Sequence, residues 1–125
     1  LKIIMPLKVQ AYERLLLYLE RVQLPVLVKR VYVPGMEKNL FHLELLQNVR
    51  EEFEHNLAQQ LYVSANTWNA VKNAKEELVN QINGTFEQLN DVADVAILAQ
   101  ALVALPNPVV EQAVLVLKND FERLL

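Results

Sequence analysis

Residues 63–86 read VSANTWNAVKNAKEELVNQINGTF, and this stretch decides the fold. Its large apolar side chains are Trp68, Val71, Leu78, Val79, Ile82 and Phe86. They recur at the three- and four-residue spacing of one helical face, which predicts a long amphipathic helix. Ser64 can cap its start, because a serine hydroxyl accepts from a backbone N–H two or three residues further on. Val63 and Trp68 stand at the hydrophobic-staple positions around that cap, so we expect the helix to begin directly after Ser64.

The preceding segment has a similar spacing and predicts a second helix, from about residues 36–39 to 62. Its expected core stripe is Leu43, Leu46, Val49, Phe53, Leu57 and Leu61. Only Val63 and Ser64 separate the two helices, so we expect them to fold back on each other as an antiparallel hairpin.

Prolines divide the N-terminal third of the chain. Pro6 suits the first turn of a helix that continues to Val22. Residues 26–33 are rich in β-branched side chains, which favours a strand, whereas Pro25 just before them favours a short helix. A lone strand would leave its backbone without hydrogen-bond partners, so we predict the short helix.

Asn83-Gly84 is the expected weak point of the long helix, because the apolar stripe rotates beyond it. This predicts a kink or a new helix, with Asn90 as its N-cap, that stops at Pro106. Asn107-Pro108 then signals the start of a last helix. That helix presents Val110, Val114, Leu117, Phe121 and Leu124 on one face.

These segments together predict the fold class. The chain has 125 residues, of which 53% are hydrophobic, and only two glycines, too few for the frequent turns of an all-β domain. We therefore expect one domain over residues 1–125, an all-α, antiparallel helical bundle of four to five main helices plus a short connector.

Charge and cysteine content exclude several classes of function. The net charge is −3 with both signs interspersed, and nucleic-acid binding requires clustered Lys and Arg. The chain has no cysteine, which excludes disulfides, thiol catalysis and cysteine-ligated metals. The charge-free run at 95–110 is too short to span a bilayer. No nucleophile–base pair is evident, so we expect neither an enzyme nor a cofactor.

A metal-binding bundle is one alternative. Glu52 and His55 have the Glu-x-x-His spacing of di-metal carboxylate proteins, and Glu54 lies between them. Such sites need a second motif, but His42, the other histidine, has Asn39 three residues before it. His55 also lies about 160–180° from Phe53 on the helical wheel, so it should face solvent. An exposed acidic face is therefore the preferred interpretation.

Arg50 and Lys75 fall near the centre of the apolar stripes of their helices. Their alkyl stems can pack while the charges reach water, and Arg50 can pair with Glu54 at i+4. The sharper alternative is an inward polar network of Arg50, Glu54 and Lys75, or a bound anion. A further alternative is a small-ligand or lipid-binding bundle, with an apolar cavity gated by Arg50 or Lys75.

Surplus apolar residues are the most informative feature for function. Leu17 and Leu115 point away from the main stripes of their helices, and Val109 and Val116 broaden the stripe of the last helix. Exposed apolar patches usually mark partner surfaces, although a fully covered core would use the same residues. We expect a non-enzymatic protein-interaction or scaffold domain that binds itself as a homodimer, or another protein. The first helix and the last two helices would form the surface that binds the partner.

Several stretches resemble an uncharacterised family of membrane-tethered α-helical proteins from Bacteroidetes. They are residues 10–15 (QAYERL), 34–36 (PGM), 50–56 (REEFEHN) and 72–77 (KNAKEE), with Val63-Ser64 and Trp68. The resemblance implies a transmembrane helix upstream of residue 1 and a cytoplasmic helical domain tethered to the inner membrane. The family has no known activity, so the resemblance implies no catalytic residue.

Overall fold

The computed structural model describes residues 4–125, and this part of the chain is helical with no strand. The elements are α1 (Ile4–Arg21), α2 (Leu24–Val31), α3 (Lys38–Glu54), the short 3₁₀ helix η1 (Leu57–Leu61), α4 (Ala65–Gln88), α5 (Val95–Val103) and α6 (Pro108–Glu122). The all-α prediction is confirmed.

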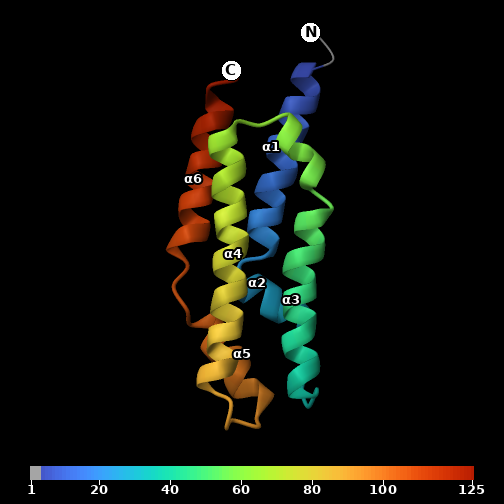
Figure 1. Ribbon diagram of the computed structural model, residues 1–125, viewed down its shortest axis with the longest axis vertical. Helices are drawn as coiled ribbons and strands as arrows, with labels where there is room; N and C mark the ends of the chain where they lie inside the picture. The colour runs from blue at the N-terminus through green and yellow to red at the C-terminus, as the bar shows by residue number, and fades with distance from the viewer. Residues whose placement is uncertain (1–3) are drawn as a thin grey trace.

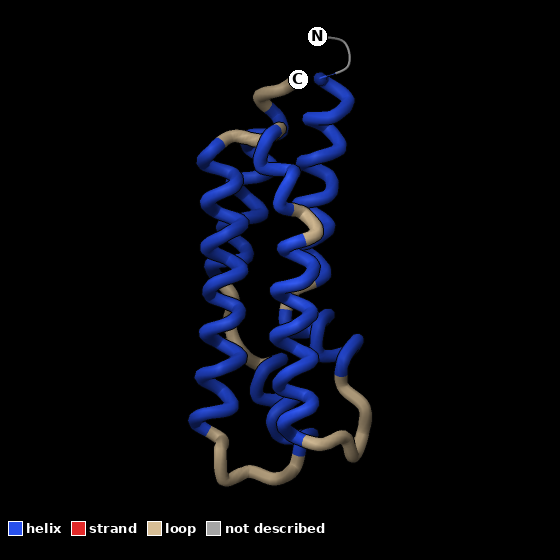
Figure 2. Tube along the Cα trace, turned by 45° about the vertical axis from the view of Figure 1, so that its right-hand side comes forward, coloured by secondary structure: helices blue, strands red, loops and turns tan. Residues whose placement is uncertain are grey.

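Four long helices, α1, α3, α4 and α6, run alongside one another as an elongated body (Figure 1). α4 packs against both α3 and α6, and α1 packs against α6. The short helices α2 and α5 contact each other in the lower half of the body, as Figure 1 is drawn. The start of α1 and the end of α6 both lie at the opposite end (Figure 1, Figure 2).

The local start signals of α2 and α4 produce the expected helices. Ser64 is the N-cap of α4, and its hydroxyl accepts a hydrogen bond from the Thr67 N–H at 3.0 Å. α2 is the short helix that Pro25 favours, and it buries Leu24, Leu27, Val28 and Val31. Helix formation satisfies the backbone of this β-branched segment internally, as argued from the sequence.

The end of α4 differs from the prediction. α4 continues unbroken through Asn83-Gly84 to Gln88, because Ile82 and Phe86 are both buried against the core. Their packing outweighs the roughly 1 kcal/mol that a glycine costs inside a helix. Asn90 is not an N-cap. Asp94 caps α5 instead, accepting from the Ala96 N–H at 3.0 Å.

The buried face of α3 also differs from the prediction. Phe41, Leu45, Val49 and Phe53 are buried, whereas Leu43, Leu57 and Leu61 are exposed. α3 ends at Glu54, and the tighter 3₁₀ turn of η1 changes the period, so Leu57 and Leu61 leave the helical face. Burying Phe41 in place of Leu43 turns the helix so that both of its phenylalanines enter the core.

Within residues 4–125, no single helix is long and apolar enough to cross a membrane. α5 and α6 meet that criterion only as a pair, and the pair is bent by 45°.

Candidate functional site

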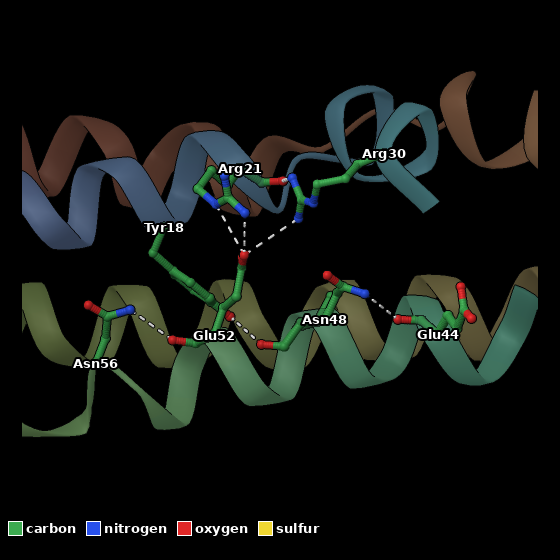
Figure 3. Close-up of polar contacts among 8 residues, drawn as sticks. Tyr18, Arg21, Arg30, Glu44, Asn48, Glu52 and Asn56 are labelled. Atoms are coloured by element: carbon green, nitrogen blue, oxygen red, sulfur yellow. Dashed lines mark hydrogen bonds and ion pairs between the residues drawn. The ribbon is translucent and has the colours of Figure 1, made fainter. Parts of the chain in front are cut away.

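The most concentrated charged site joins α1, α2 and α3 around the Glu52 carboxylate (Figure 3). Arg21 donates to Glu52 Oε1 through Nε at 3.1 Å and through Nη2 at 2.7 Å. Arg30 Nη2 lies 3.7 Å from the same oxygen. One carboxylate oxygen thus holds two guanidinium groups, which ties the ends of α1 and α2 to α3.

Backbone contacts complete this site. Arg30 Nη1 donates to the Arg21 carbonyl at 3.2 Å, at the C-terminal end of α1, where a cation is favoured. Tyr18 donates its hydroxyl hydrogen to the Val49 carbonyl at 3.0 Å. Burial raises the pKa of Tyr18 above its ordinary value of 10.0, and the negative charge of Glu52 raises it further. Tyr18 therefore stays neutral and acts as a hydrogen-bond donor.

A groove of about 210 Å³ opens beside this site, lined by Arg14, Leu17, Tyr18, Arg21, Glu52, His55 and Asn56. The second carboxylate oxygen of Glu52 is buried and has no hydrogen-bond partner within residues 4–125. The groove is therefore basic on the α1 side, with Glu52 already neutralised by arginine.

A second polar cluster lies where α1, α4 and α6 meet. Asp120 Oδ2 accepts hydrogen bonds from the hydroxyls of Ser64 and Thr67, and from the Tyr12 hydroxyl at 3.4 Å. Asp120 and Thr67 are buried. Burial raises the pKa of Asp120, but the hydrogen bonds from Ser64 and Thr67, the charge of Arg123 and the Tyr12 hydrogen bond outweigh burial and lower it below 3.8. Asp120 is therefore an ionised acceptor that fixes three helices.

Lys38 makes a third cluster at the other end of the body. Its ammonium group donates to the carbonyls of Leu89 at 3.1 Å, Asn90 at 2.8 Å and Val92 at 2.9 Å. These carbonyls directly follow α4, where a lysine can satisfy acceptors that a helix end leaves free. Lys38 therefore ties the start of α3 to the α4–α5 connection. Sequence reasoning missed this contact because the partners lie more than 50 residues apart.

His42 is a half-buried residue at the edge of the core. Its Nε2 and Asn83 Oδ1 are hydrogen-bonded at 2.8 Å, and its ring stacks on Phe86 with 4.1 Å between centroids. These contacts give it a packing role between α3 and α4.

The residues of the proposed metal site do not form a cluster of metal ligands within residues 4–125, although Glu52 and His55 line the same groove. Glu52 is held by Arg21 and Arg30, while Glu54 and His55 are exposed. Residues 4–125 contain no group of three or more His, Asp or Glu side chains that could hold a metal ion. Glu52 instead faces Arg21 and Arg30, whose positive charges neutralise its carboxylate.

Arg50, Glu54 and Lys75 do not form an inward network either. Arg50 and Glu54 are exposed, and no hydrogen bond or ion pair joins the three within the described residues. Lys75 is half-buried, and its ammonium nitrogen lies 5.1 Å from the centre of the Phe53 ring, a cation–π contact. Neither Arg50 nor Lys75 lines the groove beside Glu52 or the groove between α4 and α6, so neither is placed as the gate of a ligand cavity there.

The four apolar candidates lie on different surfaces. Leu17 lines the basic groove on α1, and Leu115 stands exposed on α6. Val109 lines a separate groove between α4 and α6, and Val116 is half-buried. The structure thus places Leu17 and Leu115 toward solvent and the two valines at the edge of the core.

Comparisons with known proteins complete the description. No curated protein and no solved structure gives a significant match to the chain. The family model described as "Family of unknown function (DUF7935)" matches residues 1–124, which is nearly the whole chain. The chain therefore belongs to this family of unknown function.

Proposed function

We propose that this chain is a non-enzymatic scaffold domain, an antiparallel helical bundle with four main helices that works by binding protein. One observation carries the proposal: large apolar side chains stand on the outward faces of helices whose cores are already filled. Leu17 is 59% exposed and Leu115 is 55% exposed, while Leu15, Leu19 and Val110 beside them are fully buried. Exposed apolar side chains of this size are a feature of partner surfaces.

The polar clusters support the same proposal. Glu52, Asp120 and Lys38 each have partners on other helices, so their charges serve to hold the bundle together. Ionisable groups that are engaged in this way are not free to act on a substrate.

The proposed partner is a second copy of the chain. α1 and α6 pack side by side, and the Tyr12 and Phe121 rings meet at a centroid distance of 5.9 Å. Tyr12 and Phe121 set an antiparallel register in which Leu17 and Leu115 lie at about the same height along the bundle. The second copy would pack against these outward faces of α1 and α6.

Light scattering after size-exclusion chromatography tests this proposal. We expect a dimer at high micromolar concentration that Leu17→Gln with Leu115→Gln converts to monomer. Leu43→Gln, on the outer face of α3, is the matched control and should leave the dimer intact. A monomer at every concentration would refute self-association.

The resemblance to membrane-tethered proteins of Bacteroidetes extends the proposal to location. In that arrangement the domain is cytoplasmic and held at the inner membrane by a segment upstream of residue 1. The encoded sequence before Leu1 tests this: a tether requires about 20 consecutive apolar residues there.

A further inference from the structure

The contact between Tyr12 and Asp120 determines which residues of α1 and α6 lie at the same height along the bundle. The two helices run in opposite directions, because the start of α1 and the end of α6 lie at the same end (Figure 1). Each helix rises about 1.5 Å per residue, so positions equally far from this contact, in the same direction, are level. Leu17 lies five residues after Tyr12 and Leu115 lies five residues before Asp120, so the two leucines are level.

Arg21 and Glu111 form a second level pair, and their charges are opposite. Both lie nine residues from the contact, Arg21 after it on α1 and Glu111 before it on α6. Arg21 also follows Leu17 by four residues, a spacing that places two side chains on the same face of a helix. Glu111 precedes Leu115 by the same spacing. α1 and α6 therefore each present an exposed leucine with a charged residue one turn away, positive on α1 and negative on α6.

The positive charge beside Leu17 is not fully neutralised within one chain. Arg21 and Arg30 both reach the same carboxylate oxygen of Glu52 (Figure 3). Glu52 carries one negative charge and the two guanidinium groups carry two positive charges, so one positive charge is in excess. The side chain of Arg21 is 45% exposed, and it lines the same groove as Leu17. A second carboxylate can therefore bind to Arg21 from outside the chain.

Glu111 is the carboxylate that matches this charge. It is exposed in the first turn of α6, and no ion pair joins it to another side chain of residues 4–125. Glu13 and Lys118 already share one groove between α1 and α6, so their opposite charges lie near each other in a single chain. Arg14 is level with Lys118, but it lines the groove beside Glu52 and so faces away from Lys118.

The remaining acidic residues of the two helices are level with uncharged amides. Glu20 is level with Gln112, and Glu122 is level with Gln10, counted from the same contact. An exposed glutamine can donate a hydrogen bond to a carboxylate. Facing α1 with α6 therefore puts no carboxylate directly opposite another.

From these observations we propose that two copies of the chain associate about a two-fold axis parallel to the bundle, with α1 of each copy against α6 of its partner. This symmetry keeps every residue at its own height, so Leu17 meets the partner's Leu115 and Arg21 meets the partner's Glu111, each contact occurring twice. A two-fold axis perpendicular to the bundle would place α1 against α1 and would separate Arg21 from the partner's Glu111. The proposal rests on the scaffold function and adds the orientation of the two copies and their dependence on charge.

Cross-linking tests the orientation. The chain has no cysteine, so each introduced thiol is the only one in its chain. Leu17→Cys and Leu115→Cys keep a small apolar side chain at the interface. When the two variants are mixed, a short bis-maleimide should link one chain of each kind, and neither variant alone should be linked to itself. Efficient linking of Leu17→Cys to itself would indicate the perpendicular axis and overturn the proposal. A mixture that light scattering shows to be dimeric but that gives no mixed product would overturn it as well.

The charge pair gives a second readout. Glu111→Gln should weaken dimerisation about two- to thirtyfold in dilute buffer, because two symmetry-related exposed ion pairs are lost. The difference from the native chain should disappear in about 1 M NaCl, where exposed charges are screened. Glu54→Gln, at an exposed position on α3, is the matched control and should leave the affinity unchanged. Equal affinities of the native chain and Glu111→Gln in dilute buffer would overturn the proposal. A native chain that is monomeric throughout refutes the scaffold's self-association instead, so the two failures are distinguishable.

Discussion

Tyr12 and Asp120 are 108 positions apart in the sequence, yet the Tyr12 hydroxyl donates to Asp120 Oδ2 at 3.4 Å and so joins α1 to α6. Ser64 and Thr67 at the start of α4 donate to the same oxygen. The carboxylate is buried, and a buried charge is retained only when hydrogen bonds replace its water. The contact between Tyr12 and Asp120 is therefore part of a buried cluster that joins α1, α4 and α6.

Replacing Asp120 by asparagine should destabilise the protein by about 2 kcal/mol at pH 7, because three hydroxyl groups lose a charged acceptor. Urea unfolding measures the change. Glu122→Gln, on the exposed side of the same helix, is the control and should have little effect.

The loss of stability caused by Asp120→Asn should depend on pH. The pKa of Asp120 is lowered in the folded protein, so its contribution is present above the ordinary value of 3.8 and is lost as the pH falls below it. The stability difference between the native chain and Asp120→Asn should therefore shrink below pH about 4. A difference that stays constant down to pH 3 would contradict this account.

Tyr18 should make the protein sensitive to alkali. Its pKa is raised by burial and by Glu52, so the unfolded chain ionises first and stability falls as the pH rises above about 10. Tyr18→Phe removes the hydrogen bond to the Val49 carbonyl and should cost about 1 kcal/mol at pH 7. It should also reduce the loss of stability above pH 10, as measured by chemical denaturation in a pH series. An unchanged alkaline slope in the variant would show that other groups cause the loss.

Lys38→Met should loosen the α4–α5 connection. Three carbonyls lose their donor, and charge-assisted hydrogen bonds of this kind contribute about 2 kcal/mol together after solvation. Hydrogen exchange should increase in residues 89–95 more than in the rest of the chain. Lys29→Met, at an exposed position on α2, is the control and should leave exchange at 89–95 unchanged.

The two apolar faces of α3 should differ sharply in energetic importance. Phe41→Ala removes a fully buried ring that contacts Tyr32 and Phe86, and should cost about 3–5 kcal/mol. Leu43→Ala, two positions away and half exposed, should cost less than about 0.5 kcal/mol. Thermal unfolding compares the two, and equal losses would contradict the observed rotation of the helix.

Local signals explain which parts of the fold could be predicted from the sequence. Ser64 caps α4, and Pro25 and Pro108 stand in the first turns of α2 and α6, because caps and prolines act within a few residues. The face of α3 could not be predicted, since α3 has apolar residues all round and only its neighbours decide which ones are buried. Asn83-Gly84 suggested a break in α4. The helix continues because Ile82 and Phe86 are buried against other helices, and this packing cannot be inferred from the sequence.

The candidate sites were harder to predict for the same reason. The partners of Asp120, Glu52 and Lys38 lie on other helices, tens of residues away, and no spacing rule connects them. The sequence spacing between Glu52 and His55 made Glu52 a candidate metal ligand, but its carboxylate binds Arg21. Exposure of Leu17 and Leu115 could be predicted, because each lies opposite the apolar face of its own helix.

The antiparallel pairing of α1 and α6, with the start of α1 and the end of α6 at one end of the molecule, determines how the fold would respond to mechanical load. A force applied between the two termini would separate α1 from α6 one turn at a time, beginning near Tyr12 and Asp120, and would not shear the helices along their length. Such a geometry breaks contacts in succession, so the domain should open at low force even if its thermal stability is high.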